Sequence, residues 1–423
     1  MSSDDEQVPQ NIPILLSEHF QNLISDDVEE ITTQLFALDV EDDVDSQEGS
    51  SSRQKEHEPE PLSYNEGAPA EFANYLQSQS DQNPDQRSLS SCVRVRVRVL
   101  SEEMKLAWLR SLETAHQDCV WACTWVPATD KSPGLLLTGS LDETVKLWNP
   151  EDLSLVRTNT GHCLGVVSVA AHPSGKIAAS ASMDSFIRVF DVESNNTIAT
   201  LEAPPSEVWQ MQFNPRGTML AVAGGSSASI KLWDTAEWKL ISTLSIPRPE
   251  GSKPSDKGSN KKFVLSVAWS PSGGQLACGS MDGSISVFDV QRAKFLHHLE
   301  GHTMPVRSLA YSPLDPRVLV SGSDDECIHM YDAEGKTLFS SMSGHSSWVL
   351  SVDVSPDGAA IASGSSDRTV KLWDPKMRAA VQTMTNHTDQ VWGVKFEAVG
   401  GGVRGSLLAS VSDDKSISLY HYS

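Results

Sequence analysis

A histidine, a serine and an aspartate fall within one short stretch near the C-terminal end of the chain, SGHSSWVLSVDVSPDGAAIASGSSDRTVKLWDP, from Ser343 to Pro375. His345, Ser363 and Asp367 are the residue types of a hydrolase triad, in which a base activates a hydroxyl and a carboxylate orients the base. An enzyme needs such a triad once, in one pocket. The number of times that the same three residue types recur therefore decides between a catalytic and a structural role.

The stretch belongs to a repeat that begins just after Met104. A strand-like run that ends in an aromatic residue recurs seven times, at Trp148, Phe190, Trp233, Phe288, Tyr331, Trp373 and Tyr420. Four of the six intervals are 42 or 43 residues long, and the other two, of 55 and 47 residues, contain the polar insertions 246–262 and 399–405. We interpret these insertions as surface loops. Without them the period is typical of WD repeats.

The repeats predict the fold class. Each contains four short β-rich runs separated by turn signals, which indicates one four-stranded sheet per repeat. Seven such sheets predict an all-β fold, a seven-bladed WD-repeat β-propeller with a central channel. The last repeat stops at Ser423 without an outer strand, whereas residues 107–116 have the outer-strand pattern with no blade before them. We therefore predict that this N-terminal strand closes the ring and removes an exposed sheet edge.

The triad residue types recur around the predicted ring. Histidines precede the innermost strand at His116, His162, His302, His345 and His387. Aspartates stand six residues before the aromatic at Asp142, Asp184, Asp282, Asp325, Asp367 and Asp414. Hydroxyls precede the aspartate by four residues at Thr138, Ser180, Ser321, Ser363 and Ser410. Because one trio occurs at five positions, we interpret it as a hydrogen-bond brace within each blade.

Two copies of this brace keep every member. They consist of His116, Thr138, Asp142 and Trp148, and of His345, Ser363, Asp367 and Trp373. The third and fourth repeats are irregular, with Pro204 and Asn260 in place of histidine and Ser227 in place of one aspartate. We predict that in a complete copy the four residues form a buried hydrogen-bond chain, running from His345 to Asp367 to Ser363 to Trp373 in the second copy, that stabilises the blade.

The chain divides by composition into a leader, residues 1–103, and the propeller, residues 104–423. The leader holds 23 acidic and 6 basic side chains, a net charge of −17, whereas the remainder carries −6. We expect a disordered acidic leader, because its apolar content is too low to offset the entropy of ordering. Within it, residues 11–40 have roughly helical apolar spacing, and Cys92–Leu100 alternates like one strand. We hypothesise that Met104 is the functional start and that the leader is variable.

Composition and motifs exclude several function classes. The acidic balance without a basic stripe argues against direct nucleic-acid binding. No run of eighteen apolar residues and no secretory pattern occurs, so we expect an intracellular protein without a membrane partner. The six dispersed cysteines favour buried thiols over zinc or disulfides. No phosphate loop, metal cluster or unique nucleophile is present, so we expect a non-enzymatic protein without cofactors.

The repeats go beyond a generic WD pattern. GHCLGVVSV, PPSEVWQMQFNP, KKFVLSVAWSP, FLHHLEGHTMPVRSLAYSP and HTDQVWGVKF resemble the WD-repeat subunit shared by the superkiller (Ski) complex and the RNA polymerase II-associated factor (Paf) complex, known in plants from vernalization independence. The resemblance covers about residues 104 to 423 and includes the irregular repeats.

The resemblance implies a monomeric, non-enzymatic propeller within two hetero-oligomers. In the cytoplasm the family holds a tetratricopeptide-repeat subunit and a helicase together for exosome-linked 3′ to 5′ mRNA decay. In the nucleus it belongs to the elongation complex that promotes histone H2B ubiquitination and histone H3 methylation. Nucleus and cytoplasm are therefore the expected locations.

Propellers bind partners mostly with the face where the histidine loop enters the inner strand. Residues three and five positions after each histidine equivalent should lie there: Trp121, Glu207, Trp209, Phe263, Arg307, Trp348 and Trp392. The residues before the turn aspartates should border the same face: Met183, Met281, Asp324 and Asp413. Exposed aromatics and arginine dominate interface energies, although some of these tryptophans could instead pack between blades. We hypothesise that this rim takes an arginine-bearing, hydrophobic peptide.

WD-repeat propellers also serve as ubiquitin-ligase receptors and as G-protein β subunits, and the sequence lacks the usual marks of both. Substrate receptors of cullin ubiquitin ligases often carry arginine two places after the W-D pair, where this chain has Glu193, Ala236, Gln291, Glu334 and Lys376. A G-protein β-like subunit would have a long N-terminal coiled coil, and the leader has no sustained heptads. The ligase receptor remains the alternative to the scaffold.

Overall fold

The computed structural model describes residues 104–130, 132–202, 208–224, 228–247, 263–398 and 406–423, together with the backbone of Ala37–Asp39 and Arg96–Arg98. The chain divides into two units, Met1–Glu102 and Glu103–Ser423. In the first unit, strand β1 (Ala37–Asp39) pairs antiparallel with β2 (Arg96–Arg98). The remainder of the leader, including most of the helical pattern expected for residues 11–40, lies outside the described residues.

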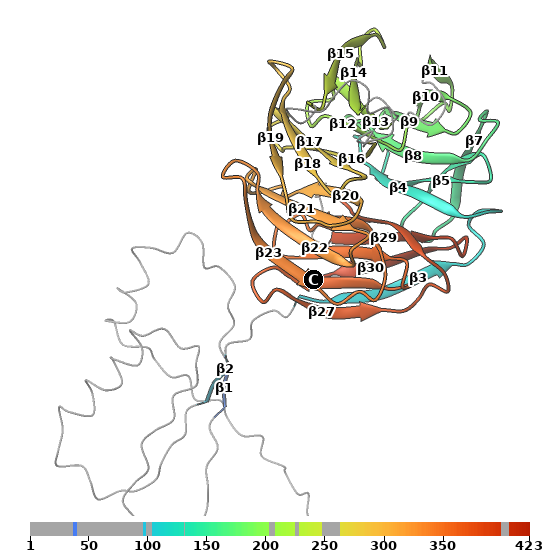
Figure 1. Cartoon of the computed structure of the whole chain (residues 1–423). Coiled ribbons are helices and arrows are strands. Elements are labelled where there is room, and N and C mark those ends of the chain that lie inside the picture. The colour runs from blue at the N-terminus through green and yellow to red at the C-terminus, as the bar shows by residue number, and fades with distance from the viewer. Residues whose placement is uncertain are drawn as a thin grey trace, which may run out of the picture. The chain divides into compact units, whose positions relative to one another are not determined.

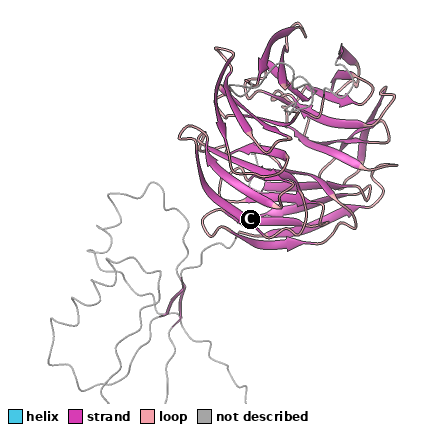
Figure 2. Cartoon of the chain, viewed as in Figure 1, coloured by secondary structure: helices cyan, strands magenta, loops and turns pink. Residues whose placement is uncertain are grey.

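The second unit consists of seven four-stranded antiparallel sheets, and strands and loops make up everything that the structure describes of it (Figures 1 and 2). In each blade the four strands follow one another from the channel outward. Blade 1 comprises β4 (Val120–Val126), β5 (Leu135–Ser140), β6 (Thr144–Trp148) and β7 (Leu155–Thr160). Blade 2 comprises β8 (Val166–Ala171), β9 (Ile177–Ser182), β10 (Phe186–Asp191) and β11 (Thr197–Glu202). Blade 3 comprises β12 (Gln210–Phe213), β13 (Met219–Gly224), β14 (Ser229–Asp234) and β15 (Leu240–Ser245).

Blade 4 comprises β16 (Val264–Trp269), β17 (Gln275–Ser280), β18 (Ile285–Asp289) and β19 (Lys294–Leu299). Blade 5 comprises β20 (Val306–Tyr311), β21 (Val318–Ser323), β22 (Cys327–Asp332) and β23 (Thr337–Ser343). Blade 6 comprises β24 (Val349–Val354), β25 (Ile361–Ser365), β26 (Val370–Asp374) and β27 (Ala379–Met384). Blade 7 comprises β28 (Val391–Phe396), β29 (Ser406–Ser412), β30 (Ile417–Tyr422) and β3 (Leu106–Leu112). The seven-bladed propeller predicted from the repeats is therefore confirmed.

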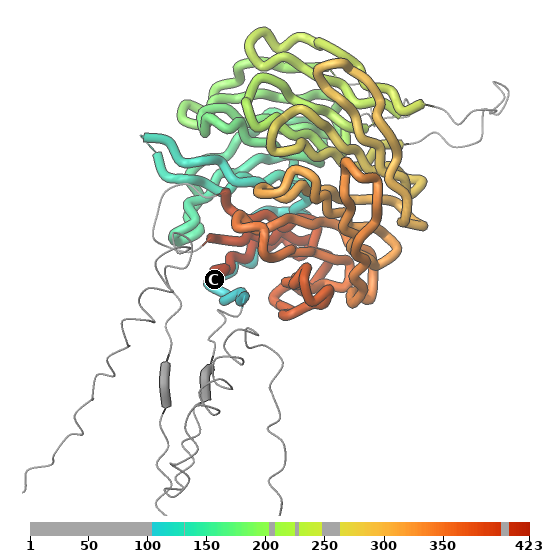
Figure 3. The backbone as a smooth tube through the Cα atoms, turned by 90° about the vertical axis from the view of Figure 1, so that its left-hand side faces the viewer, coloured from blue at the N-terminus to red at the C-terminus, as the bar shows by residue number. Residues whose placement is uncertain are grey.

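The N-terminal strand closes the ring as predicted. Strand β3 pairs antiparallel with β30, with Leu106 opposite Tyr422 and Leu112 opposite Ile417. The backbones of Lys105 and Ser423 exchange two hydrogen bonds of 2.9 and 3.1 Å. Figure 1 shows the cyan β3 beside the red C-terminal strands, and Figure 3 shows the blades following one another from cyan through green and yellow to red. The pairing leaves β30 covered instead of exposed at a sheet edge.

The core lies between neighbouring blades. Second strands such as β5, LLLTGS, are buried at every residue because both of their faces contact adjacent sheets, whereas outer strands such as β27, AAVQTM, are mostly exposed. Glycine permits the close approach of blades: a Cβ added to Gly364 would lie 2.7 Å from Val391 Cγ1 and 3.0 Å from the Val391 carbonyl oxygen. A side chain at this position would therefore push blades 6 and 7 apart.

Within the described residues, no helical segment has the length and apolar character that a membrane-spanning helix needs. The five described cysteines are free, and burial raises the pKa of Cys123 to about 12. Cys163 is exposed, unlike the buried thiols expected from the sequence.

Candidate functional site: the face at the channel mouth

The triad residue types form the predicted braces. In blade 6, His345 Nδ1 lies 2.8 Å from Asp367 Oδ2, and His345 Nε2 lies 2.7 Å from Ser363 Oγ. Trp373 Nε1 donates to the same hydroxyl at 2.7 Å. The order of bonds is thus aspartate, histidine, serine, tryptophan. The predicted order, with the aspartate between histidine and serine, is wrong, because the two nitrogens of the imidazole bond the carboxylate on one side and the hydroxyl on the other. The three donors of this hydrogen-bond chain can all be satisfied at once. The indole N–H donates to the hydroxyl oxygen, the hydroxyl donates to Nε2 of the histidine, and Nδ1–H of the histidine donates to the carboxylate.

Blade 1 repeats this geometry. His116 lies 2.9 Å from Asp142 and 2.8 Å from Thr138, whose hydroxyl also accepts from Trp148 Nε1 at 2.8 Å. The other braces of this kind in the described residues centre on His162, His302 and His387. Blade 3 shows what happens when the hydroxyl is missing. Ala223 stands at the hydroxyl position, and the buried Trp233 Nε1, which would donate to that hydroxyl, has no acceptor in the described structure.

The brace geometry excludes these trios as catalytic triads. Ser363 and Thr138 are fully buried and already bonded to a histidine and an indole, so neither hydroxyl can reach a substrate. Burial acts to raise the pKa of Asp367, but hydrogen bonds from His345 and Thr369 outweigh it and hold that pKa below its usual range. Burial also lowers the pKa of His116, although Asp142 opposes the shift. The lowered pKa of the aspartate and the lowered pKa of the histidine both favour an ionised carboxylate beside a neutral imidazole.

Backbone hydrogen bonds bring the two groups of predicted rim residues together at one end of the blades. Met183 N donates to Gly165 O at 3.1 Å, and Met281 N donates to Phe263 O at 2.8 Å. The residues before the turn aspartates therefore lie beside the loops that lead into the inner strands. We call this end of the propeller the rim face. Glu207, also predicted for it, lies outside the described residues.

Several predicted residues present apolar surface on the rim face. Met183, Met281 and Trp348 are 42%, 52% and 45% exposed. Leu164 and Met304, at 49% and 44%, lie on the same loops, two residues after His162 and His302. Neither residue was predicted for this face, because both lie two positions after a histidine and not three or five. Exposed apolar side chains gathered on one face are typical of a protein-interaction surface.

The aromatic residues of the rim face are held by neighbours from other blades. The rings of Trp121 and Trp392 have centroids 4.9 Å apart, and Trp121 Nε1 donates to Asp413 Oδ1 at 3.0 Å. Trp209 and Phe263 meet edge to face at 6.1 Å. Partial burial of these rings means that they are positioned before a partner arrives, which lowers the entropy cost of binding.

Arg307 forms a second feature of the rim face. Its guanidinium forms a bidentate ion pair with Asp324, in which Nε and Nη2 each donate at 2.8 Å. The guanidinium also lies 5.6 Å from the centroid of the Trp348 ring. Asp324 is only 6% exposed. Asp324 therefore orients Arg307, and a contact between Asp324 and a partner stays a prediction.

Comparisons with known proteins agree with this architecture. A family model described as the first β-propeller of IFT122 matches residues 119–421, so the chain belongs to this propeller family. The WD repeat-containing protein VIP3 of Arabidopsis thaliana is 75% identical over 321 residues, which are 76% of this chain and 100% of that protein. The chain belongs to the VIP3 family of WD-repeat proteins.

The resemblance to the WD subunit shared by the Ski and Paf complexes, found in the repeat motifs, is thus confirmed. More distant relatives include WD repeat-containing protein SL1-17 of Schistosoma mansoni, 32% identical over 231 residues, 54% of this chain and 71% of that protein. The meiotic recombination protein rec14 of Schizosaccharomyces pombe is 28% identical over 225 residues, 52% of this chain and 68% of that protein. VIP3 and SL1-17, both WD repeat-containing proteins, support the assignment of this chain to the WD-repeat proteins.

Proposed function

We propose that this chain is a non-enzymatic scaffold subunit that serves both the Ski complex and the Paf complex, and that the rim face holds its partners. The observation that carries the proposal is the 75% identity to VIP3 over the whole length of that protein. The exposed methionines and Trp348 support it, because preformed aromatic and apolar surface favours protein partners.

The partners proposed for the rim face are subunits of the two complexes. In the Ski complex these are the tetratricopeptide-repeat and helicase subunits, and in the Paf complex the other elongation-factor subunits. An extended segment with an arginine and an apolar residue suits the face, since Asp413 and the indole rings attract a guanidinium while Met183 and Met281 accept apolar side chains. The propeller itself is proposed to be monomeric, with no direct contact to nucleic acid or membrane.

The proposed processes follow from these assemblies. The cytoplasmic pool would support exosome-linked 3′ to 5′ mRNA decay, and the nuclear pool would support transcription elongation with histone H2B ubiquitination and histone H3 methylation. One chain can serve both if each partner presents a similar segment to one face.

Affinity purification of the full chain from separated nuclear and cytoplasmic extracts, followed by mass spectrometry, tests the proposal. We expect Paf subunits in the nuclear fraction and the tetratricopeptide and helicase subunits of the Ski complex in the cytoplasmic fraction. Recovery of cullin adaptors in place of both sets would favour the ligase-receptor alternative and contradict the proposal.

A further inference from the structure

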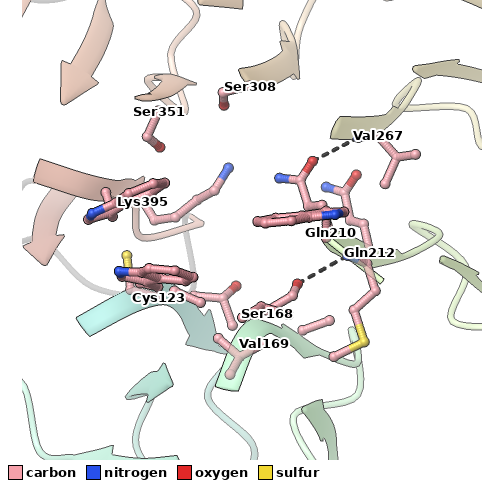
Figure 4. A pocket seen from close by; sticks show the side chains of 18 of the residues that line it. Cys123, Ser168, Val169, Gln210, Gln212, Val267, Ser308, Ser351 and Lys395 are labelled. Atoms are coloured by element: carbon pink, nitrogen blue, oxygen red, sulfur yellow. Dashed lines mark hydrogen bonds between the residues drawn. The ribbon is translucent and has the colours of Figure 1, made fainter. Parts of the chain in front are cut away.

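The central channel contains a cavity of about 280 Å³ that is lined by the innermost strands of all seven blades (Figure 4). Among its described lining residues, the ionised side chains are both basic, Arg307 near the rim and Lys395 on β28. No carboxylate belongs to this lining, although the propeller as a whole is acidic. Each of these cations is paired with a carboxylate, Arg307 with Asp324 and Lys395 with Asp353, but neither carboxylate belongs to the lining, so the basic groups are the ones that face the cavity.

Two glutamines of β12 aim hydrogen-bond donors at this cavity. Gln210 Oε1 accepts from Val267 N at 2.7 Å, and Gln212 Oε1 accepts from Trp269 N at 3.2 Å. Since each amide oxygen is bound to the backbone of blade 4, each amide nitrogen must turn the other way. Figure 4 shows the amide groups of Gln210 and Gln212 pointing into the cavity, and the structure gives their nitrogens no acceptor among the described residues.

Lys395 completes a group of donors. Its ammonium group lies 2.9 Å from Asp353 Oδ1, which is the one acceptor that the described structure gives it, and two of its protons remain available. The other oxygen of Asp353 accepts from Phe396 N at 2.8 Å, which keeps that carboxylate against the wall. In Figure 4 the end of Lys395 points toward the amide of Gln210 across the cavity. Donors from blades 3 and 7 thus face one another across the cavity.

We propose that the channel is a binding site for a small oxyanion, held by Lys395 Nζ and by the side-chain amide nitrogens of Gln210 and Gln212. A phosphate-like group is the ligand class that fits, because it offers several acceptor oxygens to this donor group and forms strong charge-assisted bonds with an ammonium. The cavity volume lies near the ~300 Å³ lower bound of small-molecule sites, so the ligand is small. The cavity shares Trp121, Trp209, Arg307 and Trp392 with the rim face, but the three donors lie on the inner strands β12 and β28, and the proposal does not depend on the proposed scaffold function.

Isothermal titration calorimetry of the full chain with inorganic phosphate, at constant ionic strength in sodium chloride, tests the site. We expect saturable binding with one phosphate per chain. Lys395→Met removes the charge, and Gln210→Glu keeps an oxygen for Val267 N while placing a carboxylate where the amide nitrogen stood. Each should weaken phosphate binding at least tenfold. Lys376→Met, at an exposed lysine after β26, is the charge-matched control and should bind as the wild type does.

The melting temperature and circular dichroism spectrum of each variant establish that it is folded before titration. Gln210→Glu preserves the hydrogen bond from Val267 N that joins blades 3 and 4. This variant can therefore still test the site if Lys395→Met destabilises blade 7. Absence of saturable binding in the wild type would overturn the proposal. Equal affinity for phosphate in the wild type and Gln210→Glu would overturn it as well, since the anion would then lie elsewhere.

Discussion

The brace of blade 6 makes a quantitative prediction for Asp367→Ala. The carboxylate accepts four hydrogen bonds: Oδ2 from His345 Nδ1 at 2.8 Å and Ser346 N at 3.1 Å, and Oδ1 from Thr369 N at 3.0 Å and Thr369 Oγ1 at 2.7 Å. Ser346 is exposed and Thr369 is half-buried, so water can replace the carboxylate for those donors. The side chain of His345 is 0% exposed, and its Nδ1 would keep only a long contact of 3.4 Å with Thr369 Oγ1.

A buried donor without a partner costs about 1–3 kcal/mol, and we expect Asp367→Ala to lower the free energy of unfolding by this amount. For a propeller of this size the loss corresponds to a fall in melting temperature of roughly 2 to 10 °C. Thermal and urea melts followed by circular dichroism measure it. Asp142→Ala in blade 1 should cost a similar amount, and the two effects should add because the two braces share no residue.

The matched control is Asp315→Ala, which removes an exposed carboxylate paired with Arg317 on the surface and should leave the melting temperature nearly unchanged. Wild-type stability of Asp367→Ala, alongside an unchanged control, would refute the interpretation of the trio as a structural brace. It would also reopen the question of why five blades share it.

Three further predictions concern the rest of the propeller. Burial, with the neighbouring His302 adding to it, lowers the pKa of His329 to about 4, so the unfolded chain binds this proton more readily than the folded one. The free energy of unfolding should therefore fall as the pH drops from 6.5 toward 4, and His329→Phe should reduce that fall in melts taken across this range; an unaltered pH profile would contradict it. Gly364→Ala should destabilise by about 1–3 kcal/mol in urea melts through contact with Val391, and wild-type stability would mean that blades 6 and 7 pack more loosely than described. Deletion of residues 105–112 should unfold or aggregate the propeller in size-exclusion chromatography, whereas an unchanged melting temperature would disprove the ring closure.

The fold was predictable because its signals repeat. All seven repeats carry the aromatic, six carry the aspartate and five carry the histidine, so the two irregular repeats do not obscure the pattern, and the unpaired outer strand at residues 107–116 indicated the closure. The order of bonds in the brace was predicted less well, because the spacing places His345 and Asp367 in one blade but does not show that the imidazole lies between carboxylate and hydroxyl.

Other features depend on contacts that sequence spacing does not reveal. The pairing of Arg307 with Asp324 gives the aspartate a role in orientation that its position before a turn did not indicate. Lys395 and Gln210 meet across the channel from blades 7 and 3, and nothing in either repeat marks them as neighbours. The repeat pattern thus predicted the blades, whereas groups of side chains that come from different blades could be found only in the structure.

The central claim is that the rim face binds the partners, and capture by rim-face variants tests it most directly. Trp348→Ala combined with Met281→Ala removes two exposed side chains, and Trp121→Ala combined with Trp392→Ala removes the paired indoles. Trp108→Ala, at a tryptophan 51% exposed on the outer strand β3, is the control. With circular dichroism spectra unchanged, both double variants should lose the Ski and Paf subunits that the wild type and Trp108→Ala capture. Full capture by both double variants would contradict the assignment of the rim face.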